Sequence, residues 1–406
     1  MSRFLPPFFP ACLVLAFGSV AVAQRPTLEA LLIDGESLVA ERIAGQASGP
    51  WELSDSKGTQ RVDGKRVLCL LGPSAAESVL PKAHLAGGQV LRGLLVGGGK
   101  GGDDFHLQSP TLGLVEMSVD RLECLVLRPE VAEARDLAMP EGAAEALFLP
   151  AALGFDRVAG TLHQFGAEGI RFQAEGEAEP RWRPLKSLIG VRIDGAEASK
   201  TPPIAELITR SGDRVFLSSF VLADGSLRAT LLDGAERTIA QADVGCLLRL
   251  DVGARFASRL EPARIAEASI AGDALMPWRC DLAGGGSLLA AGGRCYARGL
   301  GVHSRSRLEY EVPAGARSFL ARVAFDDSAL QLRVRGHVEV QVRVGDGAPV
   351  FLAELTPSDA PRLVGPIAVE GGQTLSLEVA FGKGLDAGDR IDWLLCAFLP
   401  DAIGKR

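Results

Sequence analysis

Short runs with an apolar residue at every second position recur along most of this chain, and glycine-containing turns separate them. One run is Leu308–Val312, and the pairs Ser211-Gly212, Asp224-Gly225 and Asp233-Gly234 are typical hairpin turns. Alternation with a period of two indicates β-strands that bury one face. The 48 glycines also suit many short strands and turns. The sequence therefore predicts an all-β protein and argues against a helical bundle.

The first residues have the features of a secretory signal peptide. Arg3 provides a basic start, an apolar run covers residues 13–17, and Ala21-Val22-Ala23 precedes Gln24 as a small-residue cleavage pattern. That run is too short to span a bilayer, and no later segment is long and apolar enough for a transmembrane helix. We therefore predict a signal peptide at residues 1–23, and a secreted or periplasmic protein without a membrane span.

Residues 24–251 repeat one pattern loosely, about four times. The first unit ends at residues 67–71. The second runs from 90 to 127, the third from 158 to 193 and the fourth from 204 to 250. Each reads as apolar strands with turns between them, ending in a strand with Val or Leu at every second place. The pattern is similar to that of SH3-like and Sm-like small barrels. The sequence predicts a strand-rich region of about four small β-barrel-like or sandwich units that pack on one another.

Six of the seven cysteines follow the predicted signal peptide. Cys69, Cys124 and Cys246 each lie near the end of an apolar strand in a different unit, where they cannot all pair, so we predict that they are small buried hydrophobic residues. Cys280 and Cys295 flank a glycine-rich loop and are the predicted disulfide. No spacing indicates a zinc site, and no cofactor is predicted.

The C-terminal third has its own set of strands. After a predicted linker at 252–263, the domain is expected to cover residues 264–402. Alternation predicts strands near 307–312, 317–325, 337–344, 349–355, 363–369, 374–381 and 392–399. Seven or eight antiparallel strands favour a β-sandwich of jelly-roll type. We expect a fragment from about residue 262 to fold alone.

Several motifs in this third follow one another in a characteristic order. They are Gly299-Leu300-Gly301-Val302-His303, which we interpret as a glycine-hinged turn, followed by 323–327, 337–347, 375–379 and 388–393. In this order and spacing they resemble the NPCBM family of carbohydrate-binding modules, which are often attached to glycoside hydrolases. The resemblance covers roughly residues 264–400. It implies a galactose-binding-like sandwich that holds a sugar.

A sugar site at the loops of a sandwich needs hydrogen-bonding groups for hydroxyls and often an aromatic face for the ring. The candidate ligand-binding residues are Tyr296, His303, Ser304, Arg305, Asp326, Asp327, Asp389, Asp392 and Trp393. Structural roles stay open for several of them. His303 is also suited to capping a turn, Asp326 and Asp327 to satisfying loop amides, and Trp393 to filling the sandwich core.

The net charge of −7 and the pI of about 5.5 leave no basic surface for nucleic acid. We predict a secreted, non-enzymatic carbohydrate-binding protein whose N-terminal units act as a scaffold. The expected partners are a polysaccharide or glycan and other envelope proteins. One alternative is an envelope structural or protein-interaction module. The other is a carbohydrate-acting enzyme, which would need a carboxylate pair such as Asp326 with Asp389 or Asp392.

Overall fold

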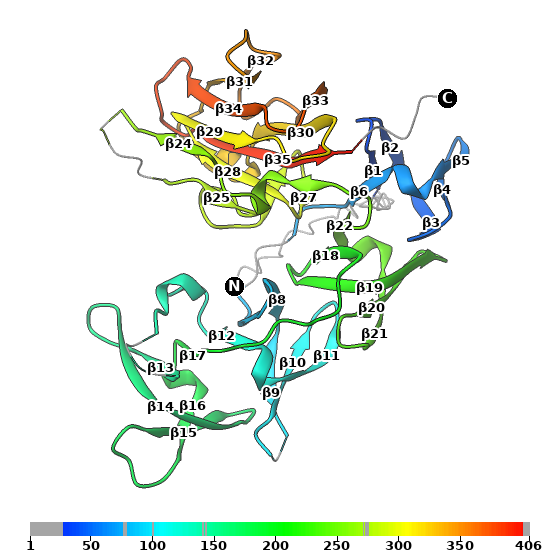
Figure 1. Cartoon of the computed structure of the whole chain (residues 1–406). Helices are drawn as coiled ribbons and strands as arrows, with labels where there is room; N and C mark the ends of the chain where they lie inside the picture. The colour runs from blue at the N-terminus through cyan, green and yellow to red at the C-terminus, as the bar shows by residue number, and fades with distance from the viewer. Residues whose placement is uncertain are drawn as a thin grey trace, which may run out of the picture.

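The computed structural model describes residues 27–75, 79–99, 101–139, 142, 144–270, 272 and 276–400, and the predicted signal peptide lies outside them. The described chain is built almost wholly of strands, with a few one- to two-turn 3₁₀ helices, so the predicted all-β class is confirmed (Figure 1). Within these ranges no helix has the length and apolar character needed to cross a membrane.

Four units in the N-terminal region share one topology. Unit 1 consists of β1 (Leu28–Leu32), β2 (Ser37–Ala40), β3 (Arg42–Gln46), β4 (Pro50–Asp55), β5 (Gly58–Asp63), η1 (Gly64–Arg66) and β6 (Val67–Leu71). Unit 2 consists of β7 (Lys82–Leu85), β8 (Gln89–Arg92), β9 (Leu94–Gly97), β10 (Asp104–Ser109), β11 (Gly113–Ser118), η2 (Val119–Arg121) and β12 (Leu122–Val126).

Units 3 and 4 use one long strand where units 1 and 2 use two short ones. Unit 3 consists of β13 (Glu145–Pro150), β14 (Phe155–Phe165), β15 (Gly169–Ala174), β16 (Arg181–Pro184), η4 (Leu185–Ser187) and β17 (Gly190–Ile193). Unit 4 consists of β18 (Ala205–Thr209), β19 (Arg214–Ala223), β20 (Ser226–Leu231), β21 (Glu236–Ala240), η5 (Gln241–Asp243) and β22 (Val244–Arg249). A further 3₁₀ turn, η3 (Ala134–Asp136), lies between units 2 and 3.

The strand order explains why each unit is a small barrel. The first strand of every unit pairs with the second and also with the last, after the chain has passed through the hairpins and the 3₁₀ turn. The last strand therefore lies beside the first, on the side away from the second, and this strand order is similar to that of SH3-like small barrels. The sequence missed the opening strands β7 and β13, so units 2 and 3 begin earlier than predicted. These strands are short and sit beside turn residues, which hides their alternation.

Pairs of units are joined through their last strands. In β6 and β22 every residue is buried, and the two strands pair directly, with Cys246 opposite Leu71 and Leu248 opposite Cys69. In units 2 and 3, β12 and β17 pair in the same way, with Cys124 opposite Arg192. Covering on both faces explains the unbroken apolar run in β6. Cys69, Cys124 and Cys246 are buried, as predicted.

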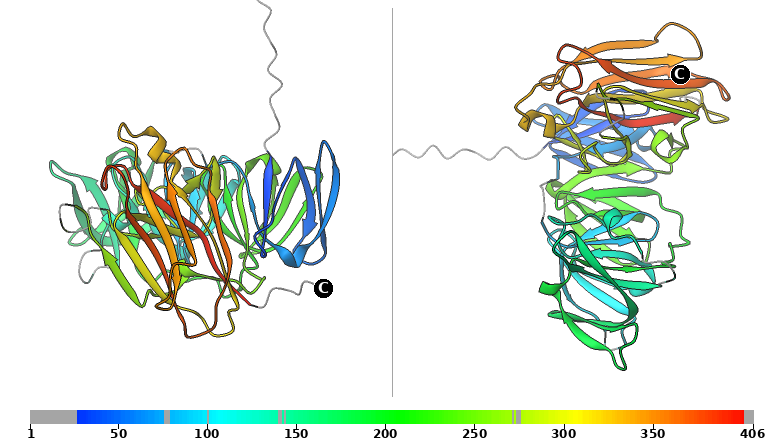
Figure 2. Two further views of the ribbon diagram at one scale, coloured as in Figure 1. Left: turned by 90° about the horizontal axis from the view of Figure 1, so that it is seen from above. Right: turned by 90° about the vertical axis from the view of Figure 1, so that its left-hand side faces the viewer.

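The order of the units in space differs from their order in the chain. Unit 4 pairs with unit 1 through β19 and β3, and it also touches unit 2 through a bridge between Arg214 and Val90. The spatial order is therefore unit 1, unit 4, unit 2 and unit 3. Figure 2 shows the resulting elongated molecule, with the C-terminal sandwich at one end and units 2 and 3 at the other.

The C-terminal third is a β-sandwich of two antiparallel sheets, as predicted. Sheet F contains β23 (Arg255–Phe256), β25 (Arg279–Cys280), β28 (Gly299–His303), β30 (Ser318–Phe325), β33 (Arg362–Ala368) and β35 (Arg390–Leu399). Sheet G contains β24 (Arg264–Glu267), β29 (Ser306–Glu311), β31 (Val338–Val344), β32 (Phe351–Leu355) and β34 (Thr374–Phe381). A small hairpin, β26 (Leu289–Ala291) and β27 (Arg294–Tyr296), and the turns η6 (Ala257–Arg259) and η7 (Asp327–Gln331) complete it. The seven predicted strands correspond to β29–β35.

The segment 252–263 is not a simple linker, which corrects the prediction. Within it, β23 pairs with β35, with Phe256 opposite Ala397. The next residue, Ala257, is buried in the sandwich core together with Tyr310 and Trp393. The sandwich therefore begins before residue 264. Two paired residues are too short a strand to be recognised by alternation.

The sandwich and the N-terminal units share a hydrophobic core. Leu68, Cys69 and Leu248 of units 1 and 4 pack in one buried cluster with residues from the outer face of sheet F and the β26–β27 hairpin. The sandwich residues of this cluster include Leu289, Cys295, Tyr296, Leu320, Leu394 and Ala397. Sheet F is thus covered on both faces, by sheet G on one side and by the units on the other.

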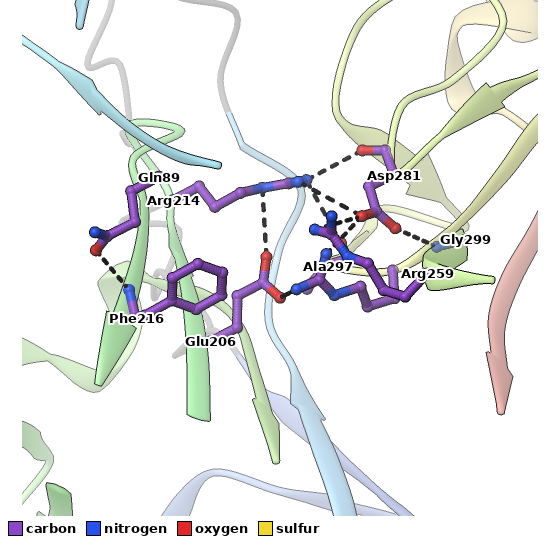
Figure 3. A network of polar contacts seen from close by, with 9 residues as sticks. Gln89, Glu206, Arg214, Phe216, Arg259, Asp281, Ala297 and Gly299 are labelled. Atoms are coloured by element: carbon purple, nitrogen blue, oxygen red, sulfur yellow. Dashed lines mark hydrogen bonds and ion pairs between the residues drawn. The ribbon is translucent and has the colours of Figure 1, made fainter. Parts of the chain in front are cut away.

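A buried ionic network crosses the same interface (Figure 3). Glu206 of unit 4 lies 2.5 Å from Arg298 of the sandwich, which also pairs with Asp281 at 2.6 Å. Arg214 of unit 4 donates to the Asp281 backbone carbonyl, and Arg259 reaches the Asp281 carboxylate at 2.9 Å. Because burial raises the pKa of Glu206 to about 7, desolvation outweighs the attraction of the arginines there. The network therefore holds the two parts in one orientation at a desolvation cost.

Candidate carbohydrate-binding site

Most of the predicted polar residues lie at one edge of sheet F. At this edge β28 and β30 end and β35 begins, with His303 opposite Arg390 and Phe325 opposite Ile391. Antiparallel neighbours bring such strand ends together. The residues directly after β28 are Ser304 and Arg305, those directly after β30 are Asp326 and Asp327, and the residue directly before β35 is Asp389. The structure therefore collects residues that are far apart in the chain.

One group at this edge has a structural role. Ser304 donates its hydroxyl hydrogen to Asp389, which also accepts the His337 amide at 3.0 Å. Burial raises the pKa of Asp389, while these two hydrogen bonds oppose the shift. Both Ser304 and Asp389 are buried. They fasten the end of β28 to the start of β35 and do not face solvent.

His303 and Arg305 are more accessible. His303 is half-buried, and its Nδ1 lies 2.7 Å from the Ser304 carbonyl oxygen. Nδ1 must carry the proton to donate to a carbonyl, which leaves Nε2 as an acceptor. Arg305 is exposed. These two side chains retain groups that can bind a ligand.

Asp326 and Asp327 organise the loops. Asp326 caps η7 by accepting the Ser328 amide at 3.0 Å, and it also accepts the Ala290 amide. Asp327 accepts the Gly293 amide at 3.0 Å, so both carboxylates anchor the β26–β27 hairpin. The structural alternative for these residues, satisfaction of loop amides, is confirmed. Asp327 is nevertheless only half-buried, and it lines a cleft between the sandwich and the N-terminal units.

Asp392 lies against Asp326 in a fully buried position. Neither of its carboxylate oxygens accepts a hydrogen bond within the described residues. Burial, followed by the charge of Asp326 and the contact with it, raises the pKa of Asp392 well above its usual range. The pair is therefore stable when Asp392 keeps its proton and donates it to Asp326.

The Asp392→Asn variant is expected to melt at a higher temperature than the wild type at pH 8, and the difference should become smaller as the pH is lowered towards 4. A raised folded-state pKa contributes stability at low pH, and this stability is lost as pH rises above the ordinary Asp value towards the raised one. Asparagine can donate to Asp326 at every pH. Thermal melting of both proteins across this range measures the difference, and parallel melting curves at all pH values would contradict the shared proton.

The two predicted aromatic ligand contacts are wrong, because both rings are fully buried. Trp393 fills the sandwich core together with Phe398 and Tyr310. Tyr296 lies in the core shared with the units, and its hydroxyl accepts a hydrogen bond from Arg322 at 3.3 Å. Neither ring can stack on a sugar at the surface.

The predicted disulfide between Cys280 and Cys295 is also absent. Both are free thiols, with Cys280 exposed at the edge strand β25 and Cys295 buried against units 1 and 4. The hairpin β26–β27 carries Cys295 away from Cys280 and into the interface. The described residues contain no group of three or more His, Cys, Asp or Glu side chains suited to a metal ion.

The Gly299–His303 segment is a strand, not the predicted turn. Its glycines are required by close packing instead. A Cβ at Gly301 would lie 2.3 Å from the Leu282 carbonyl oxygen and 2.5 Å from the Gly284 amide nitrogen. The absence of a side chain lets the loop after β25 lie flat on β28, beside the residues that line the cleft.

A polar cleft of about 580 Å³ opens between this edge and the N-terminal units. The sandwich side includes Asp326, Asp327, Ser328 and Gln331, together with residues 285–290. Across the cleft lie Lys82, Arg92, Glu130 and Glu133. Burial lowers the pKa of both Lys82 and Arg92. The second group could not be predicted from the sequence, because no local pattern shows which unit faces the sandwich.

The C-terminal third is a two-sheet β-sandwich docked on small barrels, with polar residues gathered at one sheet edge. Residues 257–398 match the family described as "NPCBM/NEW2 domain", so the predicted resemblance is confirmed for the C-terminal third. A curated relative from Renibacterium salmoninarum, named as an endo-alpha-N-acetylgalactosaminidase, is 27% identical over 119 residues. The match covers 29% of this chain and 8% of that protein.

Two solved structures are similar to parts of the chain. The CBM51 module of Clostridium perfringens GH95 in complex with methyl-galactose is 19% identical and covers 36% of this chain and 98% of its own, with a TM-score of 0.31. The tandem CBM51 modules of Streptococcus pneumoniae Sp3GH98 are 12% identical and cover 92% of this chain and 88% of their own, with a TM-score of 0.32. The assignment therefore depends on the family match and on the sandwich itself.

Proposed function

We propose that this protein is an exported, non-enzymatic carbohydrate-binding protein that holds a glycan in the cleft between its sandwich and unit 2. The observation that carries the proposal is the NPCBM/NEW2 domain at residues 257–398, whose polar edge forms one wall of that cleft. The match to this family makes a sugar the expected class of ligand. The cleft is the concave surface beside the polar edge of sheet F.

The chemistry of the cleft suits a polyhydroxylated ligand. A hydroxyl both donates and accepts, and the walls offer cations at Lys82 and Arg92, carboxylates at Asp327 and Glu133, and the amide of Gln331. Charged partners give the stronger hydrogen bonds. Because no described aromatic residue lines the cleft, hydrogen bonds rather than ring stacking would provide the affinity.

The positions of the carboxylates support a non-enzymatic role. A glycosidase needs two carboxyl groups that flank the scissile bond across a cleft. Asp326 is committed to loop amides and lies against Asp392, while Asp389 is buried under Ser304. The enzyme hypothesis requires Asp326 to act together with Asp389 or Asp392. As in the predicted arrangement, units 1–4 would serve as the scaffold that completes the cleft.

The test is calorimetric titration of the full chain with a panel of oligosaccharides that includes methyl-galactose and N-acetylglucosamine. Gln331→Ala and Lys82→Ala are each expected to weaken binding by about 1 kcal/mol, because each removes one hydrogen-bonding group that makes no described contact essential to the fold. Lys65→Ala is the matched control, since Lys65 is exposed on unit 1. It should bind like the wild type.

Two outcomes would overturn the proposal. If the folded protein binds no glycan in the panel, the alternative of a structural or protein-interaction module is favoured. If a glycan binds and both cleft variants retain full affinity, the sugar lies elsewhere.

A further inference from the structure

Unit 3 exposes a tryptophan that the sandwich and its cleft do not use. The chain has four tryptophans, all among the described residues, and Trp182 on β16 has 53% of its surface exposed. Trp51 and Trp393 are fully buried, and Trp278 is half-buried. A large apolar ring left in water on a short strand is an unusual feature in a chain with few aromatic residues.

The ring stands in a row of polar side chains across the open face of a three-stranded sheet. Trp182 lies opposite Arg171 on β15, which in turn lies opposite Gln164 on β14. Directly opposite residues point to the same face. The adjacent residues Ile170 and Phe172 point the other way, into the barrel core. The outer face therefore carries an indole at one side and hydrogen-bonding groups beside it.

The indole is held in place by a glycine. A Cβ at Gly166, in the turn between β14 and β15, would lie only 2.9 Å from two atoms of the six-membered ring of Trp182. Gly166 is not in the left-handed region, so its backbone conformation does not demand glycine. The glycine makes room for the ring. A ring seated in this way loses little freedom when a ligand covers its other face.

The neighbouring guanidinium remains available. Arg171 is exposed, and within the described residues its side chain makes no hydrogen bond or ion pair. Arg183 differs, because it is paired with Glu177 at 2.5 Å. Arg171 can therefore donate up to five hydrogen bonds to a ligand that lies over Trp182.

We propose that Trp182 and Arg171 form a second sugar-binding surface, on which a pyranose ring of a polysaccharide stacks. The apolar face of a pyranose matches the exposed indole, and its hydroxyls lie at the ring edge, within reach of a guanidinium on the same face. A protein partner would be expected to meet a wider apolar patch, whereas this ring shares its face with Arg171 and Gln164.

The position of the Trp182 surface on the molecule bears on how tightly a polysaccharide would bind. Unit 3 lies at the end of the molecule away from the sandwich (Figure 1). Two sugar sites in one chain, one in the cleft between the sandwich and unit 2 and one on unit 3, would engage the same polymer at two points, and this raises the overall affinity without any new contact. The proposal goes beyond the cleft and does not depend on it, because no residue is shared.

The experiment follows tryptophan emission of the full chain during titration with a soluble galactan and a soluble glucan. Trp182 is the most exposed of the four tryptophans, so binding at this surface should change the emission in a saturable way. Calorimetric titration, which does not need this indole as a reporter, is expected to show binding about three- to tenfold weaker in Trp182→Ala and nearly unchanged in Trp182→Phe. Arg171→Ala should weaken binding about threefold or more.

Matched variants separate this surface from the cleft. Lys82→Ala combined with Gln331→Ala should leave the Trp182 emission change intact even if the cleft loses its ligand, and Trp278→Phe should behave like the wild type. The proposal is overturned if neither polymer changes the emission of the wild type. It is also overturned if Trp182→Ala, with an unchanged melting temperature, binds both polymers equally well or alters only self-association.

Discussion

A fragment that begins at residue 262 is expected to lose its cooperative melting transition, although it carries ten of the eleven strands of sheets F and G. It lacks β23 and Ala257, and it exposes the outer face of sheet F that is buried against units 1 and 4. Each large apolar side chain returned to water costs about 1.5–3 kcal/mol, and Leu289, Leu320 and Leu394 are all fully buried at this face. For these three side chains the sum is about 4.5–9 kcal/mol, which is comparable to the whole stability of a typical domain.

Calorimetry of three proteins measures this effect. They are the fragments 262–406 and 252–406 and the chain from residue 27. The fragment from 252 restores β23 and η6 but not the covering units, so it too should melt without cooperativity. A cooperative transition in the fragment from 262, as expected from the sequence alone, would show that the shared core is dispensable.

Replacing Glu206 by alanine is expected to destabilise the protein by about 3–5 kcal/mol. Glu206 is completely buried between Arg298 and Arg214, so its removal leaves the positive charges of three arginines facing Asp281 alone. The free-energy cost of desolvating these guanidinium groups is then no longer offset by their attraction to Glu206. Urea unfolding, with the slope checked for two-state behaviour, gives the change in free energy.

Glu52→Ala is the matched control for this substitution. Glu52 pairs with Arg61 at 2.7 Å, but both side chains are largely exposed. Exposed pairs contribute at most about 1 kcal/mol, so this variant should unfold close to the wild type. Equal losses in the two variants would mean that the buried network does not hold the interface.

The strands and barrels of this chain could be predicted because their signals are local. A strand with one solvent-exposed face shows alternating apolar and polar residues in the sequence, as β29 and β31 do. Turn residues mark the hairpins of unit 4. The candidate site was less predictable. Ser304, Asp326 and Asp389 lie at one edge of sheet F, but their hydrogen-bonding groups are used within the protein.

Burial on two faces explains the failures at Tyr296 and Trp393. In β35 every residue after Arg390 is buried, because sheet G covers one side and the units cover the other. Alternation distinguishes two faces but does not show that both are covered. The same reason applies to Cys295, whose partner surface belongs to β6 and β22, more than forty residues away along the chain at the nearest.

The amino-acid sequence by itself determined the all-β class, the repeated small units, the strands of the sandwich and its NPCBM character. These follow from the period of apolar residues, the positions of glycine and a set of short motifs. Only the tertiary structure decided the spatial order of the units, the shared core, the Glu206 network and the cleft. Each depends on contacts between residues far apart in the chain, and a local pattern records which face is apolar but not what covers it.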